Sequence, residues 1–260
     1  DEIEEITGIV NGTTNYMMTE MSEKGADFDE VLKDAQAKGY AEKDPTADIE
    51  GYDACRKIAI LTSLVCGQQV DFEDIHTEGI THISATDIKY AKAMGRAIKL
   101  LATSKKTDGG YVAMVAPFLL PKEHPLYNVN GVFNAIFVHG NVLGDAMFYG
   151  SGAGKLPTAS AVVSDIVDEV KHLNRNIMTM CDQDKVELLP ISDTSKRFFV
   201  RIKGEPQAMK AHLESKFGPI EIVQVEPLEG EFGFLTEIMT EGHFEQCKKE
   251  FPSILHRIRV

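Results

Sequence analysis

The chain of 260 residues carries 27 basic and 40 acidic side chains, a formal net charge of −13, and is 43% hydrophobic and 26% charged. This is the balance of a globular protein; the acidic charge argues against nucleic acid and anionic membranes as partners, and no apolar run approaches the roughly 20 residues that span a bilayer. The widely spaced cysteines (Cys55, Cys66, Cys181 and Cys247) predict no metal site and no disulfide framework, as in a cytoplasmic protein with reduced thiols.

The first quarter of the chain is predicted to be mostly helical. Apolar spacing indicates a helix over residues 3–24, interrupted by the polar segment Asn11–Asn15, where backbone could meet a ligand or another element. Asp27 is the expected N-cap of a second helix, with Glu30 completing a capping box and Gly39 as the stop.

An acidic loop over residues 40–51 separates these helices from the next. A third helix is predicted from Tyr52 to Cys66, ending at Gly67. A further helix over 84–95 is predicted to begin at the N-cap Ser84, with an acidic residue three positions on.

The middle of the chain changes to strands. Turns are expected at Asp108–Gly110 and His139–Asn141, and a helix is expected from Pro157 to Leu173. The fold class is therefore α+β, with helices on a mostly antiparallel mixed sheet. The predicted strands are runs rich in Val, Ile, Phe, Tyr and Ala, at 96–104, 111–119, 132–139 and 143–149.

The end of the chain is predicted to form a separate small unit. Residues 176–195 read as a linker between a first domain over 1–175 and a second over 196–260. The second domain has the order βαββαβ, which gives a four-stranded ferredoxin-like sheet with two helices on one face. Its strands are expected at 197–203, 220–226, 232–240 and 254–260, and its helices at 206–217 and 243–250.

The segment Gly39–Lys57 is the strongest candidate for chemistry. Its acidic loop runs into a helix on which Asp53 and Lys57, four residues apart, share one face. Carboxylates could hold the ammonium group of a zwitterionic substrate, and a lysine could move a proton to or from a hydroxyl. Taken alone, the pattern favours a solvated loop with one surface ion pair.

This segment resembles the substrate loop of the homoserine dehydrogenase family, with the pattern GYxExDPxxDxxGxDxxRK. The resemblance implies that Glu42 binds homoserine, that Asp53 helps to position it, and that Lys57 is the catalytic lysine exchanging the proton of the substrate hydroxyl. A second segment, Gly8–Tyr16, is similar to the family's GIxNGTTNY, although it could equally be a helix-packing device.

A third segment, the glycine-rich turn at residues 150–162, resembles the family's GxGAGxxPTASAV. Gly150, Gly152 and Gly154 would let backbone N–H groups approach an anion or a flat ring. The turn lacks the Walker A spacing and does not open a dinucleotide-binding unit. The resemblance implies contact with the nicotinamide end of NADP or NAD, whereas the spacing alone fits a plain strand-to-helix turn. His124, on a proline-bounded loop, is more often structural than catalytic.

The C-terminal βαββαβ unit resembles an ACT domain, a regulatory module that binds small molecules. By that resemblance, L-threonine is a possible effector at the first strand-to-helix turn, Gly204-Glu205-Pro206-Gln207. The family commonly has Pro-Gly at this turn, so the departure here weakens the expectation of threonine binding. The open edge expected at 220–226 predicts self-association into a dimer or tetramer.

The resemblance as a whole implies an NAD(P)-dependent enzyme that interconverts L-aspartate 4-semialdehyde and L-homoserine in threonine, methionine and isoleucine biosynthesis. No GxGxxG motif follows an opening strand, so we expect the nucleotide-binding domain, the family's metal site and a second lysine to lie upstream, and these residues alone to be inactive. The alternative is a non-catalytic amino-acid-binding or assembly fragment. A fused aspartate kinase is disfavoured because the regulatory module follows the dehydrogenase part.

Overall fold

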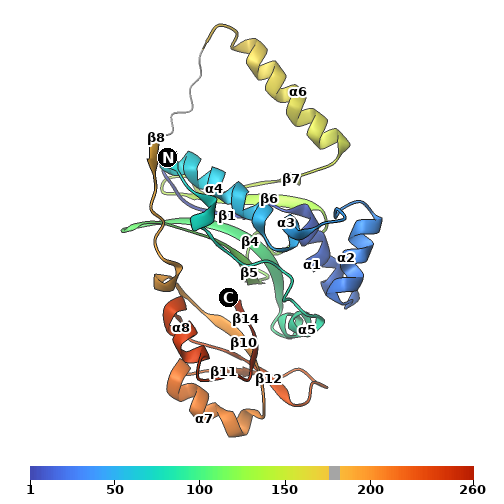
Figure 1. Cartoon of the computed structure of the whole chain (residues 1–260), viewed down its shortest axis with the longest axis vertical. Coiled ribbons are helices and arrows are strands. Elements are labelled where there is room, and N and C mark those ends of the chain that lie inside the picture. The colour runs from blue at the N-terminus through green and yellow to red at the C-terminus, as the bar shows by residue number, and fades with distance from the viewer. Residues whose placement is uncertain (176–181) are drawn as a thin grey trace.

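The computed structural model describes residues 1–175 and 182–260, and one long sheet runs through it (Figure 1). Its strands are β1 (Ile3–Ile9), β3 (His76–Thr77), β4 (Arg96–Thr107), β5 (Gly110–Pro121), β6 (Phe133–Gly140), β7 (Gly144–Ser151), β10 (Phe198–Lys203), β11 (Glu221–Val223), β12 (Glu231–Leu235) and β14 (Ile254–Arg259). The order across the sheet is β11-β12-β10-β14-β5-β4-β1-β6-β7, with β3 beside β5. Pairing is antiparallel except at β14–β5 and β3–β5.

Helices cover this sheet in two groups (Figure 1). The first comprises α1 (Gly12–Lys24), α2 (Phe28–Ala37), α3 (Thr46–Ile49), α4 (Tyr52–Cys66) and α5 (Ala85–Ala93), and the second comprises α7 (Pro206–Phe217) and α8 (Glu241–Lys248). Short pieces complete the chain: β2 (Gln68–Gln69) pairs with β8 (Asp182–Lys185), β9 (Ser195–Lys196) pairs with β13 (Met239–Thr240), and η1 (Phe72–Asp74) and η2 (Ile191–Asp193) are 3₁₀ turns.

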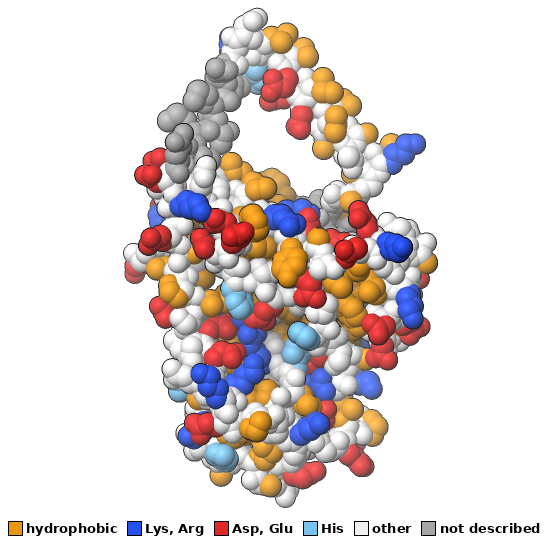
Figure 2. Space-filling view, viewed as in Figure 1, with side chains coloured by type: hydrophobic (Ala, Val, Ile, Leu, Met, Phe, Trp, Pro, Cys, Tyr) orange, Lys and Arg blue, Asp and Glu red, His pale blue; other side chains and the backbone are white. Residues whose placement is uncertain are grey.

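Helix α6 (Lys155–Lys171) stands away from the rest of the molecule in Figure 1. None of its residues is buried, and Figure 2 shows hydrophobic side chains gathered along it. Most of these recur every three or four residues and form one stripe, which is the pattern of a helix that packs against another surface. The exposed apolar residues of this segment are Leu156, Val162, Val163, Ile166, Val167, Val170 and Leu173.

The predicted helix over residues 3–24 is wrong in its first third. Ile3–Ile9 form β1, which lies in the sheet between β4 and β6. The β-branched residues of this segment suit a strand buried on both faces, and pairing with two neighbours outweighs the helical apolar spacing. The polar interruption at Asn11 marks the N-cap of α1, since its side chain accepts a hydrogen bond from the N–H of Thr14.

The other predictions for the first part are largely confirmed. α4 has the predicted bounds, α5 has the capping box of Ser84 and Asp87, and β4 to β7 are two hairpins at the predicted positions. The second helix has Asp27 at the predicted N-cap position, but without the side-chain bond of a capping box, and it ends at Ala37, before Gly39. Helix α6 begins two residues before Pro157.

The C-terminal unit has the predicted βαββαβ order, β10-α7-β11-β12-α8-β14, with β11 at the edge of its sheet. Its strand expected over 232–240 is instead β12, ending at Leu235, followed by the short β13. The core of the unit is built mainly from phenylalanine side chains, namely Phe198, Phe217, Phe232, Phe234, Phe244 and Phe251.

The C-terminal unit is packed closely on the first part. Phe199, Leu235 and Ile258 belong to the same buried cluster as Ile58 and Val115 of the first part. The predicted linker begins with residues 176–181, which include Cys181 and lie outside the described residues. From residue 182 onward the segment is not irregular, because it contains β8 and η2.

Candidate active site

A cleft of about 430 Å³ lies where the start of α1, the loop before α4 and the glycine-rich turn after β7 meet. It is lined by Asn11, Gly12, Thr13, Lys38, Gly39, Tyr40, Asp48, Asp53, Lys57, Val132, Asn134, Gly152, Ala153 and Gly154. A second cavity of about 440 Å³ shares Lys57, Asn134 and Gly152 with this cleft. Its remaining lining is mostly apolar, with Val10, Ile60, Leu61, Phe148 and Tyr149 among it.

Asn11 organises the acidic side of the cleft. It lies where β1 passes into α1, and its Oδ1 accepts from the Thr14 N–H at 2.9 Å while capping that helix. Its Nδ2 is thereby left to donate to Asp48 Oδ1 at 2.7 Å and to Asp53 Oδ2 at 2.9 Å. One amide therefore holds two carboxylates from α3 and α4 close together, which concentrates negative charge at one wall.

Lys57 lies beside this carboxylate pair. Its Nζ donates to Asp53 Oδ2 at 2.7 Å and to the carbonyl of Val10 at 2.9 Å. The i,i+4 pairing confirms that the two side chains share one face of α4. A lysine ammonium has three N–H groups, so the third is available to a group in the cleft. Because the side chain of Lys57 is 46% exposed, a ligand can reach it.

The backbone that carries these groups depends on two features of the loop. Asp44 accepts hydrogen bonds from the N–H and hydroxyl of Thr46, which fixes the start of α3 and lowers the pKa of the Asp44 carboxyl. Gly51 has a φ of +82° between α3 and α4, a conformation that favours glycine. This turn directs Asp53, in the first turn of α4, toward Asn11.

The structure does not bring Glu42 into the cleft. Its side chain is exposed, and it is not among the lining residues. Its carbonyl accepts from the Gln36 side chain at 3.0 Å, which holds the loop against α2. Asp48 lies in the cleft instead, and sequence reasoning did not single it out. Two signals were available: Asp48 is a fixed position of the loop pattern, and the polar Asn11–Asn15 segment lacked a partner that spacing could identify.

The predicted glycines form the opposite wall. Gly152 and Gly154 line the cleft, while Gly150 and Gly152 line the apolar cavity. A Cβ at Gly152 would overlap the side-chain amide of Asn134, and Gly154 has a φ of +117°. Nothing lies within 4 Å of a Cβ placed on Gly150. The structure therefore brings the glycine-rich turn together with Lys57 and Asp53, which are about 100 residues away in sequence.

The two remaining candidates lie elsewhere. His124 Nδ1 accepts from the Leu126 N–H at 3.1 Å, and burial lowers the pKa of its imidazole, so the geometry indicates a turn-stabilising histidine outside the cleft. The predicted effector turn lies between β10 and α7. Gly204 has a φ of +131°, Glu205 is the N-cap of α7 without a side-chain cap bond, and Pro206 is its first residue, followed by Gln207.

Within residues 1–175 and 182–260, no helix has both the length and the apolar character needed to cross a membrane. Over the same ranges, no three or more His, Cys, Asp or Glu side chains are grouped so that they could hold a metal ion. Cys55, Cys66 and Cys247 are free thiols, and burial raises the pKa of Cys55 and Cys247.

Comparison with known proteins gives a consistent result. The homoserine dehydrogenase family model matches residues 1–167. The homoserine dehydrogenase of Synechocystis is 40% identical over 98% of this chain and 66% of its own length, and that of Pseudomonas aeruginosa is 38% identical over 98% and 58%. The crystal structure of a homoserine dehydrogenase from Thiobacillus denitrificans superposes with a TM-score of 0.88 at 33% identity, covering 100% of this chain and 64% of that one.

A more distant solved structure is that of a hyperthermophilic archaeal homoserine dehydrogenase in complex with NADPH. It has a TM-score of 0.56 at 30% identity and covers 67% of this chain and 49% of its own. The chain thus spans under two thirds of the length of each of these four relatives, between 49% and 66%.

Proposed function

The chain belongs to the homoserine dehydrogenase family, and from that premise we propose that it is the substrate-binding and catalytic part of an enzyme that interconverts L-aspartate 4-semialdehyde and L-homoserine. This reaction belongs to threonine, methionine and isoleucine biosynthesis, and we propose that it takes place in the cytoplasm. The observation that carries the proposal is the cleft in which Asn11 joins Asp48 and Asp53 beside Lys57.

The substrate carries an ammonium group that suits the acidic wall. Asp48 and Asp53 offer carboxylate oxygens, and charge-assisted hydrogen bonds to an ammonium group are the strong ones. Glu42 remains a proposed ligand of the same group, supported by its place in the loop motif. Because its side chain is exposed outside the cleft, this contact requires the loop over residues 40–44 to close over the substrate.

Lys57 is the proposed acid–base group. In the direction of reduction, its third N–H would give a proton to the substrate oxygen as the alkoxide forms, and in oxidation the neutral amine would take that proton back. Asp53 keeps the ammonium oriented through the 2.7 Å hydrogen bond.

The proposed cofactor is NADP or NAD, which supplies or accepts the hydride when bound. The residues present fit the nicotinamide end: Gly150 leaves room for close approach, and the apolar cavity beside Lys57, lined by Gly150 and Gly152, suits a flat ring. The remainder of the dinucleotide needs a binding domain. The apolar stripe of α6 is a surface that such a domain could cover.

The test is to measure L-homoserine oxidation with NADP⁺ by the complete protein that contains this chain. A rate that depends on homoserine and is abolished by Lys57→Ala supports the proposal. A complete protein that binds NADPH but does not oxidise homoserine would contradict the proposed function.

A second reading applies to these 260 residues by themselves, namely a non-catalytic amino-acid-binding or assembly fragment. It is favoured by the short coverage of the relatives. Titration of the chain with NADPH separates the two readings, because binding in the micromolar range argues for a cofactor-competent unit.

We further propose that residues 196–260 form an ACT-like regulatory unit that self-associates through the edge strand β11, within a homo-oligomer of dimer or tetramer size. L-Threonine is the proposed effector at Gly204–Gln207. Glu221→Pro should block strand addition at this edge, because proline lacks the N–H that a paired strand needs. Light scattering should then report a smaller assembly, and an unchanged mass would remove β11 from the interface.

A further inference from the structure

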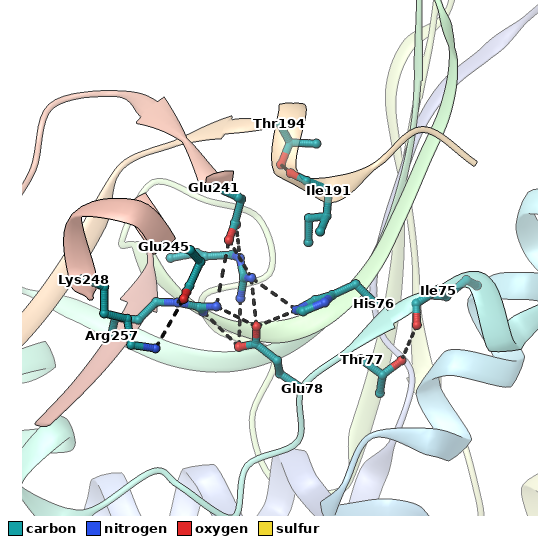
Figure 3. Close-up of polar contacts among 11 residues, drawn as sticks. Ile75, His76, Thr77, Glu78, Ile191, Thr194, Glu241, Glu245, Lys248 and Arg257 are labelled. Atoms are coloured by element: carbon teal, nitrogen blue, oxygen red, sulfur yellow. Dashed lines mark hydrogen bonds and ion pairs between the residues drawn. The ribbon is translucent and has the colours of Figure 1, made fainter. Parts of the chain in front are cut away.

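Glu78, directly after β3, is held by the C-terminal unit (Figure 3). Arg257 donates to its two carboxylate oxygens at 2.9 and 2.8 Å, and Arg259 donates to the same oxygens at 3.0 and 2.9 Å. His76 Nε2 lies 2.6 Å from Glu78 Oε1. Both arginines come from β14, so a single carboxylate of the first part receives two guanidinium forks from the second.

The charged groups at this contact all have partners of opposite charge within the protein. Arg259 is fully buried and also pairs with Glu241, and Arg257 lies 3.8 Å from Glu245. Burial by itself would raise the pKa of Glu78, but hydrogen bonds from His76, Arg259 and Arg257 outweigh it and hold the pKa well below its usual range. Glu78 is therefore a fixed anion at neutral pH, with its acceptor capacity used inside the protein.

The backbone on either side of Glu78 is joined to the sheet and to the substrate loop. The Glu78 N–H donates to the Val115 carbonyl at 2.8 Å, and the Ile80 N–H donates to the Ile49 carbonyl at 2.8 Å. Between them, Gly79 lies so close that a Cβ would overlap the Ile49 carbonyl oxygen and the backbone of Glu50. The segment after β3 therefore packs directly against the end of α3.

The same segment also meets the start of α4. A Cβ on Gly51 would lie 3.2 Å from side-chain atoms of Thr77 and Val115 and 3.4 Å from the Glu78 carbonyl oxygen. Ile49–Gly51 is the short connection between Asp48 on one side and Asp53 on the other. The position of this connection sets the distance between the two carboxylates that Asn11 joins.

We propose that Glu78 is a positioning residue for the substrate cleft. The arginines of the C-terminal unit fix Glu78, and the segment that it anchors maintains the distance between the carboxylates of Asp48 and Asp53. The assignment of homoserine to that cleft rests on the proposed function. Glu78 touches no cleft-lining side chain among its hydrogen-bond partners in the described residues. Its effect is therefore expected on substrate binding, through loop order, with little change in proton transfer.

The test compares Glu78→Gln with Asp87→Asn in the complete protein. Asp87 is the matched control, because it is a buried carboxylate that also joins the two units, accepting from Arg201 at 2.9 Å, but it lies on α5. Glu78→Gln should raise the KM for homoserine about tenfold, change kcat less than about threefold and leave the cofactor KM unchanged. Asp87→Asn should lower the melting temperature without raising the KM.

Amide hydrogen exchange gives a readout that needs no catalysis. In the 260-residue chain, Glu78→Gln should speed exchange over residues 46–53, and Asp87→Asn should not. Equal KM increases in the two variants, or unchanged exchange over 46–53 in Glu78→Gln, would overturn the proposal. If the wild-type protein does not oxidise homoserine, the proposed function fails while exchange still decides the role of Glu78. If Glu78→Gln does not fold, Arg257→Lys, which keeps the charge but loses the fork, replaces it in both measurements.

Discussion

The carboxylates of the cleft and those at the junction between the two units are the same chemical groups in different situations. Asp53 is 32% exposed and is held by one lysine and one amide. At the junction, Asp87 and Glu241 are buried, and each receives charge-assisted hydrogen bonds from arginine. A carboxylate in a cleft whose oxygens can still accept hydrogen bonds marks a ligand site. A carboxylate whose oxygens are all paired within the protein marks a structural contact.

The lysines repeat this contrast. Lys57 uses two of its three N–H groups within the protein and lies at the cleft. Lys99 is 2% exposed and donates to Asn15 Oδ1, the Val129 carbonyl and Asn130 Oδ1 at 3.1, 2.6 and 2.8 Å, which uses all three. Changes in the cleft should therefore alter turnover or binding, and changes at the saturated sites should alter stability, except at Glu78, which also acts on binding through the loop that it anchors.

The largest expected effect is that of Lys57→Ala. Loss of a positioned acid–base group should lower kcat for homoserine oxidation by about 10²–10⁴-fold, with little change in the melting temperature, because Lys57 is half-exposed. Steady-state kinetics of the complete protein give the result. Lys43→Ala, an exposed lysine of the loop before α3, is the control and should retain full activity. A Lys57→Ala enzyme with more than half of the wild-type kcat contradicts the assignment.

Arg259→Met should have the largest effect on stability. It leaves Glu78 and Glu241 without their buried partner, and breaking a buried ion pair costs about 3–5 kcal/mol of unfolding free energy. Urea unfolding followed by circular dichroism measures this loss. Lys216→Met, which breaks the exposed pair with Glu250, should shift the midpoint little. Equal shifts in the two variants would mean that the buried junction network contributes no more to stability than an exposed ion pair does.

Part of this contrast could be predicted from sequence, and part could not. The i,i+4 spacing of Asp53 and Lys57 is local, so their shared helix face follows from sequence alone. The capping box at Ser84 and the hairpins after Arg96 are local in the same sense. For Ile3–Ile9 the local sequence predicts a helix, whereas the structure has a strand. The burial of this strand between β4 and β6 depends on segments about 100 and 130 residues away.

The ion pairs at the junction between the two units could not be predicted from the sequence for the same reason. Arg259 and Glu78 are 181 residues apart, and an arginine near the chain end carries no sign in the sequence of which carboxylate it pairs with. Asn11 was noticed only as a polar interruption. Its bonds to Asp48 and Asp53, 37 and 42 residues away, depend on how α1, α3 and α4 converge.

Asp48→Asn tests which carboxylate of the cleft binds the substrate ammonium group. Removing the charge while keeping the shape should raise the KM for homoserine roughly 10–100-fold, since a hydrogen bond to a charged group contributes about 1.5–3 kcal/mol. Glu42→Gln should raise the same KM by a smaller factor, and more than it raises the cofactor KM. A larger effect at Glu42 than at Asp48 would mean that the closed loop, and not the open cleft seen here, binds the substrate ammonium.

Gly150→Ala tests the opposite wall with a smaller effect. The added methyl group has no neighbour within 4 Å in the protein, so the melting temperature should not change. If the nicotinamide ring lies against this turn, the KM for NADPH should rise about tenfold, or ~1.4 kcal/mol. Gly152→Ala, which would collide with Asn134, should lower both stability and cofactor affinity. An unchanged NADPH KM in Gly150→Ala would place the ring elsewhere.

The smallest expected effect is a pH dependence at Lys99. Burial lowers the pKa of its ammonium to about 8, whereas an unfolded lysine titrates near 10.4. At pH values between these two, the unfolded state binds more protons than the folded state, so folding becomes more favourable as pH rises. The unfolding free energy of the wild type relative to Lys99→Met should therefore increase by about 1 kcal/mol between pH 7 and pH 9. Urea unfolding at both pH values measures this difference, and Lys210→Met, on the surface of α7, controls for general charge effects. A difference between wild type and Lys99→Met that stays constant would mean that the buried amine does not titrate in this range, and the contrast between a saturated and an available lysine would then rest on geometry alone.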